Sequence, residues 1–413
     1  MSTYTDRIPE PGLLTIRKLM RNISAPIRLD QGDVSLDMPE SAKSAVARAL
    51  RDNQTHYMAP AGLPDLRRAL AEKVLSRNGV QCRPDDVVVT NGGLQAIHIV
   101  CQTLLEPGDE VIVADPEWSP CVTAILATGA IPVRCPLLRG LGWRWNIADV
   151  AAAITPRTKA IFVNSPNNPT GGVLTEDDLR ALAALAQRHD LWVIADEAYE
   201  DLVFEGPRHF SIASISGMQD RTVSVYTFSK SYAMTGLRLG YAVTRSRDVS
   251  AALEKLMYYS CLNVCSLTQH AGLGLLQASD NYLDVMRPEI DQRRLHFSNR
   301  LSEELSGLFE AARPMAGLYV FARIGTALRT VWKRDEAKYP SLSWWVVELL
   351  IREAHVGALP GVEFGPAGEG YVRFCFSREY EDLNAAISRL AHFSDGIMLE
   401  AAGGPGLLSE AGA

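Results

Sequence analysis

Short apolar runs rich in β-branched residues alternate with stretches of helical periodicity from about residue 85 to residue 244. Runs that are apolar throughout are typical of strands covered by helices on both faces of a sheet. The alternation therefore predicts βα units that build a mostly parallel sheet sandwiched by helices. Seven strands are predicted, at residues 87–90, 110–114, 131–134, 159–163, 191–195, 222–226 and 239–244, with helices at 95–105, 120–127 and 175–188.

The pattern changes after about residue 282, where a smaller α+β domain is predicted. The residues that follow the last predicted helix, 394–413, end in a Gly-, Ala- and Pro-rich segment without periodicity, so we expect a disordered tail. The elements predicted for this region are a helix at 287–306, a strand at 318–324, a helix at 343–355, a strand at 371–375 and a helix at 379–392.

Composition and charge exclude several classes of protein. The chain has 413 residues, and its 41 Lys and Arg stand against 48 Asp and Glu, so no basic excess is available to attract nucleic acid or anionic lipid. The 7 cysteines are odd in number and include no C-x-x-C pair, which argues against a disulfide framework and a zinc ribbon. No segment has the pattern of a signal peptide or of a membrane span. We expect a cytoplasmic protein without a metal site.

The segment around Lys230 carries the clearest chemical signal. Lys230 follows the predicted strand at 222–226 in a loop of small residues, and Arg238 stands eight residues later. Partial burial beside an arginine can suppress the charge of a lysine and leave a free amine able to form a Schiff base. Thr227 and Ser229 add hydroxyl donors that, with the guanidinium, suit a phosphate dianion. A phosphorylated aldehyde cofactor would satisfy both halves of the pattern.

This segment resembles the cofactor-lysine motif S-K-x-x-x-x-x-G-x-R-x-G of the class I/II aminotransferases of fold type I. These aspartate aminotransferase-like enzymes use pyridoxal 5'-phosphate (PLP). Asn168 lies in a turn similar to their N-P-x-G turn, and Asp196 and Tyr199 lie in a segment similar to their D-E-x-Y. The resemblance implies that Asn168 contacts the cofactor's phenolic oxygen and the substrate, and that Tyr199 contacts the same phenolic oxygen. Asp196 would pair with the pyridinium nitrogen and keep the ring an electron sink.

Further matches extend the resemblance over nearly the whole chain. Gly93 and Leu94 match the turn whose backbone amides bind the cofactor phosphate, although a side-chain donor often stands where this chain has Leu94. Trp118 falls where relatives keep an aromatic ring that stacks on the pyridine. Gly32 resembles their backbone contact near the substrate carboxylate. Arg373, which follows a segment similar to P-G-x-x-F-G, resembles the arginine that binds that carboxylate.

Tyr57 lies in a segment that resembles Y-x-x-x-x-G-x-x-x-L-R, whose tyrosine reaches the cofactor phosphate of the neighbouring subunit. The resemblance therefore implies a homodimer with shared active sites. It also implies a two-domain organisation, in which residues 50–285 form the large PLP-binding domain and residues 1–49 join residues 286–393 in the small domain.

The activity implied by the resemblance is transfer of an amino group between an amino acid and a 2-oxo acid, through a Schiff base on Lys230 and with ping-pong kinetics. The same residues also serve PLP-dependent lyases, replacement enzymes and cyclases of the aminocyclopropane-carboxylate synthase type, so these alternatives stay open. A regulatory sensor module fused to a DNA-binding domain is a further alternative, but no basic extension precedes Gly32. The candidates for a pocket that selects the substrate side chain are Arg17, Glu117, Tyr319 and residues 258–266.

Overall fold

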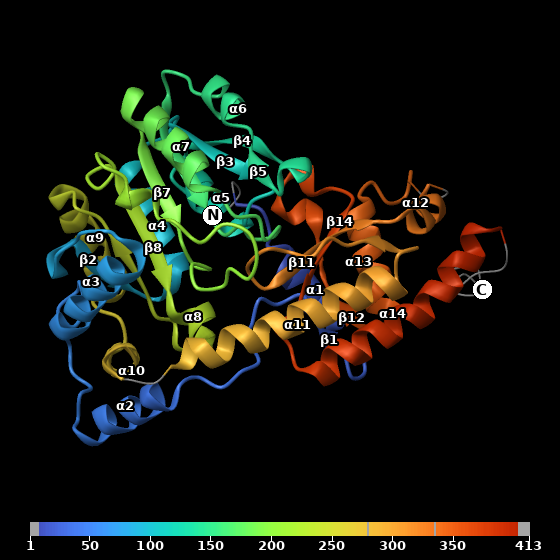
Figure 1. The fold of residues 1–413 in the computed structure, drawn as a ribbon, viewed down its shortest axis with the longest axis horizontal. Coiled ribbons are helices and arrows are strands. Elements are labelled where there is room, and N and C mark those ends of the chain that lie inside the picture. Colours follow the sequence, from blue (N-terminus) through green and yellow to red (C-terminus); the bar gives the residue numbers. More distant parts are fainter. Residues whose placement is uncertain (1–7, 279–280, 334–335, 404–413) are drawn as a thin grey trace, which may run out of the picture.

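An eight-stranded sheet forms the centre of the larger part of the protein (Figure 1). The structure, a computed structural model, describes residues 8–278, 281–333 and 336–403. Five neighbouring strands, β8, β7, β6, β3 and β4, run parallel, whereas β9 and β2 at one end and β5 at the other are antiparallel to their neighbours. The strands are β2 (Val87–Thr90), β3 (Glu110–Asp115), β4 (Ile131–Leu138), β5 (Arg144–Trp145), β6 (Thr158–Asn164), β7 (Trp192–Asp196), β8 (Thr222–Thr227) and β9 (Gly240–Val243).

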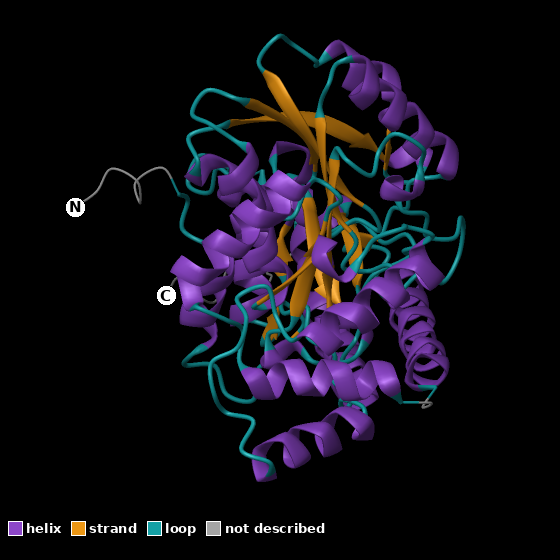
Figure 2. Cartoon of the chain, turned by 90° about the vertical axis from the view of Figure 1, so that its left-hand side faces the viewer, coloured by secondary structure: helices purple, strands orange, loops and turns teal. Residues whose placement is uncertain are grey.

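Helices cover both faces of this sheet, as Figure 2 shows on either side of the strands. On one face α4 contacts β7, β8 and β9, and α9 packs against α4 and β2. On the other face Leu179 and Leu182 of α7 share a core with Ile161 and Val193 of the strands. The helices of this part are α3 (Pro64–Asn78), α4 (Gly92–Leu104), α5 (Ser119–Ala127), α6 (Ile147–Ala152), α7 (Glu176–Arg188), α8 (Phe228–Ser231), α9 (Arg247–Cys261) and α10 (Ser266–Gln277).

The prediction of seven strands missed one strand of the sheet. Strand β5 is only two residues long and pairs with the end of β4, where Leu137 lies opposite Trp145. A strand of two residues at a sheet edge is too short to form an apolar run, so the hydrophobic pattern could not predict β5. The other strands overlap their predicted positions, and β2, β3 and β9 are buried along their full length.

A smaller α+β unit is built by the two ends of the chain. Its antiparallel sheet has the order β10-β11-β14-β13, and β1 pairs in parallel with β12. Helix α1 contacts β13 and α13, whereas α2 packs against α10 of the larger part. The elements of this unit are α1 (Gly12–Met20), β1 (Ile27–Arg28), α11 (Tyr282–Glu304), β10 (Phe309–Glu310), β11 (Tyr319–Ile324), α12 (Thr326–Trp332), α13 (Leu342–Arg352), β12 (Val356–Gly357), β13 (Leu359–Pro360), β14 (Tyr371–Cys375) and α14 (Tyr380–Ala401), whereas α2 (Glu40–Arg51) lies against the larger part.

The disordered tail predicted at 394–413 is wrong for its first residues, because α14 continues to Ala401. Phe393 and Ile397 are buried in the core of the smaller unit, and their four-residue spacing continues the apolar stripe of the helix. Asp395 and Gly396 interrupt this stripe and are typical of a turn, so sequence analysis ended the helix too early. Residues 404–413 lie outside the described residues.

Candidate active site

The carboxyl ends of three parallel strands line a cavity of about 490 Å³ between the two parts of the protein. Asn164 ends β6, Asp196 ends β7 and Thr227 ends β8, and Asn164 and Asp196 are register partners. This edge is where α/β proteins bind their ligands. Apart from Tyr57, every predicted site residue lines the cavity: Gly32, Gly93, Leu94, Trp118, Asn168, Asp196, Tyr199, Thr227, Ser229, Lys230, Arg238 and Arg373.

Lys230 lies in the short helix α8, directly after β8, and its side chain is half-buried. Its ammonium group donates to the backbone carbonyl oxygen of Gly32. A Cβ atom at Gly32 would lie 1.8 Å from the phenolic oxygen of Tyr319, so only glycine permits this close approach. The N-terminal segment thus brings a neutral acceptor to the lysine amine.

Asp196 is a buried carboxyl whose charge depends on what lies beside it. The pKa of Asp196 is raised to about 6, chiefly by burial and to a smaller extent by Glu197. The backbone N–H of Ala198, which donates to Oδ1 at 3.1 Å, and the charge of Lys230 oppose this rise in pKa. A cation placed next to Asp196 would favour its ionised form. The carboxyl is therefore suited to pair with a protonated ring nitrogen.

The beginning of α4 and the loop after β8 form a corner of the cavity that is suited to an anion. Gly92 has a φ of +75°, and a Cβ atom there would lie 2.4 Å from Nη2 of Arg238. The hydroxyls of Thr227 and Ser229 lie 2.9 Å apart. The N–H groups of a helix N-terminus, two hydroxyls and a guanidinium together suit a phosphate. Gly93, in the first turn of α4, lines the cavity at this corner.

Arg373 reaches the cavity from β14 with 4% of its surface exposed. It donates to Oδ1 of Asn168 at 2.9 Å and to the backbone oxygen of Asp30 at 2.8 Å. Its guanidinium carbon lies 4.0 Å from the ring centroid of Tyr319, and its Nε has no hydrogen-bond partner. These neighbours are neutral, so the positive charge is available to an incoming carboxylate.

Two aromatic residues complete the wall. The phenol of Tyr199 lies 2.9 Å from the phenol of Tyr319. Burial and the neighbouring Tyr319 raise the pKa of Tyr199 well above its ordinary value, so Tyr199 acts as a neutral O–H group. Trp118 immediately precedes α5 and is half-buried.

Some residues that sequence analysis considered lie elsewhere, and others were missed. Tyr57 is 85% exposed and outside the cavity. Arg17 and Tyr319 line the cavity as expected, but Glu117 and residues 258–266 do not. Asn164 lines it and was missed as a site residue, although its place at the end of a predicted strand was a usable signal.

The residues present fit PLP, which carries an aldehyde, a phenolic oxygen, a ring nitrogen and a phosphate. The cavity offers an amine at Lys230, a carboxyl at Asp196 and the corner at α4 that is suited to an anion. Two buried polar atoms that face no protein partner, Oδ1 of Asn164 and Nε of Arg373, belong to residues that line this same cavity. A bound molecule can supply hydrogen-bond partners for such atoms.

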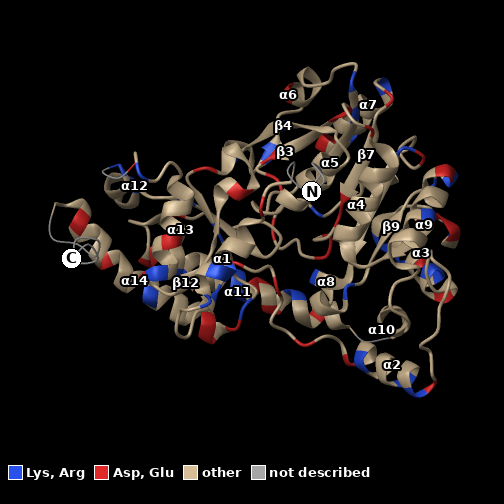
Figure 3. Ribbon diagram, turned by 180° about the vertical axis from the view of Figure 1, so that it is seen from behind, with Lys and Arg blue, Asp and Glu red and all other residues tan. Residues whose placement is uncertain are grey.

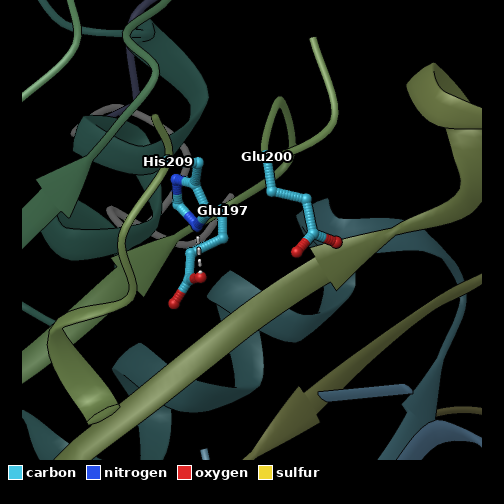
Figure 4. Close-up of side chains that lie close together, drawn as sticks. All are labelled: Glu197, Glu200 and His209. Atoms are coloured by element: carbon cyan, nitrogen blue, oxygen red, sulfur yellow. Dashed lines mark hydrogen bonds and ion pairs between the residues drawn. The ribbon is translucent and has the colours of Figure 1, made fainter. Parts of the chain in front are cut away.

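A second group of titratable residues lies directly after Asp196 in the chain (Figure 4). The carboxylate of Glu197 accepts from Nε2 of His209 at 2.8 Å, and their polar atoms lie within 4.8 Å of those of Glu200. The ammonium of Lys73 forms an ion pair with the carboxylate of Glu200, so a side chain of the protein itself balances this negative charge. We interpret the group as an ion-pair network that fastens α3 to the chain after β7.

The surface carries charges of both signs. Figure 3 shows blue and red residues interspersed on the outer helices, among them α2, α3, α9 and α14. The mixture agrees with the formal net charge of −7 and forms no extensive basic face in that view. Within the described residues, no helix combines the length and the apolar character needed to cross a membrane.

Comparison with known proteins places this site in a family. Residues 24–390 match the family model described as "Aminotransferase class I and II". The chain is 35% identical to an aspartate aminotransferase of Pyrococcus abyssi over 94% of this chain and 97% of the relative. It is 34% identical to aromatic-amino-acid aminotransferase 2 of Thermococcus litoralis over the same shares. A solved aspartate aminotransferase of Thermus thermophilus with maleate aligns with a TM-score of 0.85 at 34% identity, covering 95% of this chain and 99% of that one.

These matches extend over both parts of the fold and include the strand ends that line the cavity. They favour amino-group transfer over the lyase, replacement, cyclase and sensor alternatives. The chain therefore belongs to the class I and II aminotransferases and is a PLP-dependent enzyme of amino-group transfer.

Proposed function

We propose that the enzyme moves the amino group of an amino acid to a 2-oxo acid in the cavity around Lys230, in two half-reactions with ping-pong kinetics. The observation that supports this is the meeting of a lysine amine, the buried carboxyl of Asp196 and the buried guanidinium of Arg373 in one cavity. PLP, when bound, supplies the electron sink that stabilises negative charge at the substrate α-carbon.

Each side chain then has a separate task. Arg373 binds the α-carboxylate of the substrate, and Asn168, to which it donates at 2.9 Å, keeps the guanidinium in place. Lys230 would hold PLP covalently, and its released Nζ would take the α-proton from the substrate and deliver it to the cofactor's aldehyde carbon. Asp196 would keep the ring nitrogen protonated, and Tyr199 would donate to the phenolic oxygen.

A panel of amino acids tests the proposed reaction. The panel includes acidic and aromatic amino acids, because relatives bear the names of aspartate and aromatic aminotransferases. A productive amino acid should convert the bound cofactor from its aldehyde to its amine form and release one equivalent of 2-oxo acid, followed by absorbance and mass spectrometry. A 2-oxo acid should then restore the aldehyde form. Release of ammonia without the amine form would instead favour elimination.

We also propose that the enzyme is a homodimer in which Tyr57 completes the partner's site. Tyr57 is 85% exposed, and Tyr259 and Tyr258 are 79% and 50% exposed. The backbone N–H of Met58 donates to Oδ1 of Asn263 at 3.4 Å, so these tyrosines belong to neighbouring segments of one surface. Exposed aromatic residues that gather in this way are typical of protein interfaces.

Mixed dimers test the shared site. Light scattering should give twice the mass of one chain. Tyr57→Ala should weaken PLP binding about tenfold, because one hydrogen bond to a charged phosphate is lost. When Tyr57→Ala and Lys230→Ala subunits are mixed at limiting PLP, activity should rise above the sum of the separate variants, because one site in each mixed dimer is intact. No gain on mixing, with proven exchange of subunits, would place Tyr57 in its own chain's site.

A further inference from the structure

The loop between β3 and α5 carries a buried acid that the roles above do not use. Glu117 is 0% exposed, and its backbone N–H donates to the carbonyl oxygen of Phe364 at 2.8 Å. Its Oε1 accepts from Nδ2 of Asn164 at 2.6 Å and from the backbone N–H of Trp118 at 2.7 Å. Asn164 and Trp118 line the cofactor cavity, whereas Glu117 does not. The carboxyl of Glu117 therefore acts on the cavity through these two neighbours.

The surroundings of Glu117 favour an uncharged acid. Arg134, a neighbouring cation, instead donates to the carbonyl oxygen of Phe364 at 3.1 Å and lies 3.6 Å from Asp115. Oε2 of Glu117 is buried and has no hydrogen-bond partner. An ionised carboxylate in such a place would lose its hydration without gaining an ion pair, which is costly. A carboxylic acid avoids most of this cost.

Three charged or titratable groups face Glu117. They are Asp196 on β7, Arg134 on β4 and Cys121 on α5. The pKa of Glu117 is raised to about 8, chiefly by burial and to a smaller extent by the carboxyl of Asp196. The hydrogen bonds from Asn164 and Trp118 and the charge of Arg134 lower the pKa, but less than burial raises it. At neutral pH the carboxyl therefore carries its proton.

Asn164 links this acid to the chemistry of the site. Asn164 is the register partner of Asp196, so its carboxamide stands beside the carboxyl that faces the ring nitrogen. We propose that Glu117 is a positioning residue for the cofactor, which as a neutral carboxylic acid holds the carboxamide of Asn164 and the backbone of Trp118 on the cavity wall. The inference rests on the cofactor site described above and adds to it a residue that does not touch the cofactor.

Cofactor binding to the apoenzyme tests the positioning role. Glu117→Gln keeps an acceptor of the same size and should bind PLP nearly as well as the wild type. Glu117→Leu removes the acceptor and should weaken PLP binding about tenfold, as expected for the loss of hydrogen bonds that fix two wall residues. Failure of the wild-type apoenzyme itself to bind PLP would refute the cofactor site. Wild-type affinity in Glu117→Leu would refute only the role of Glu117.

A double-mutant cycle separates positioning from a general loss of structure. Glu117→Leu, Asn164→Ala and the double variant are titrated with PLP. If Glu117 acts through Asn164, the double variant should lose clearly less affinity than the product of the two single losses. A loss equal to that product would mean that the two residues act independently and would overturn the proposal.

The protonated state has a test that needs no cofactor and no Leu variant. A carboxyl whose pKa is raised on folding contributes stability below its unfolded pKa, near 4.5, and this contribution is lost as the pH rises towards about 8. Between pH 5 and pH 8 the melting temperature of the wild-type apoenzyme should fall more than that of Glu117→Gln, which cannot titrate. Other groups titrate equally in both proteins and cancel. Parallel curves would show that Glu117 is ionised in the fold.

Discussion

Replacement of Lys230 by alanine should lower the rate of amino transfer by about 10⁴-fold, the upper end of what a positioned general base contributes. The variant loses both the amine that holds the cofactor and the group that moves the α-proton. The structure supports both tasks, because the half-buried amine of Lys230 lies in the cavity wall with Asp196 and Arg373. The rate is measured in single turnovers with a productive amino acid from the panel.

The matching control is Lys255→Ala, because Lys255 is an exposed lysine of α9 and does not line the cavity. Borohydride reduction followed by peptide mass spectrometry should find the cofactor on Lys230 in the wild type and in the control. A reduced lysine adduct that persists in Lys230→Ala would show that another residue holds the cofactor.

Replacement of Asp196 by alanine should leave the covalent attachment intact but slow the exchange of the substrate α-hydrogen by about 10²–10³-fold, the usual cost of losing one preorganised electrostatic partner. Without the carboxylate the ring nitrogen loses its proton and the ring stabilises less negative charge. The exchange is followed in deuterated water by NMR. Asp37→Ala serves as the control, because the Asp37 side chain is 93% exposed. Unimpaired exchange in Asp196→Ala would refute the assigned role.

The pKa of Asp196 also sets a pH dependence for PLP binding. Because this pKa is raised to about 6, the apoenzyme must release a proton below that pH before the carboxylate can pair with a protonated ring nitrogen. PLP affinity of the wild-type apoenzyme should therefore fall as the pH drops below about 6. Asp196→Ala should lack this fall, which equilibrium titrations from pH 5 to pH 8 can detect.

Sequence analysis predicted most strands of the large sheet, but it missed several helices, among them α2, α3 and α9. Strands such as β2 and β3 were found because they are apolar and buried along their full length. Helix α2 was missed because the residues it buries, Ala42, Ala45 and Ala49, have helical spacing but are small. Small side chains give a weak apolar signal even where they pack closely against another helix.

The site could be predicted where its residues stand at strand ends in known motifs. Contacts between distant segments could not be predicted in this way. Arg373 and Asp30 are 343 residues apart in the chain, and their hydrogen bond depends on how the two parts of the fold meet. The hydrogen bond between Glu117 and Asn164 joins the ends of two strands, and no spacing rule in the sequence predicts it.

Helix α1 forms part of the cavity wall that is separate from the residues proposed to carry out the reaction. Leu13 and Arg17 of α1 line the cavity, whereas Asn164, Asp196 and the lysine loop belong to the ends of the sheet strands. Mutations in α1 can therefore accumulate in a gene lineage without disturbing the residues that handle the proton. Leu13 and Arg17 therefore make α1 one segment to randomise when substrate preference is to be changed by directed evolution.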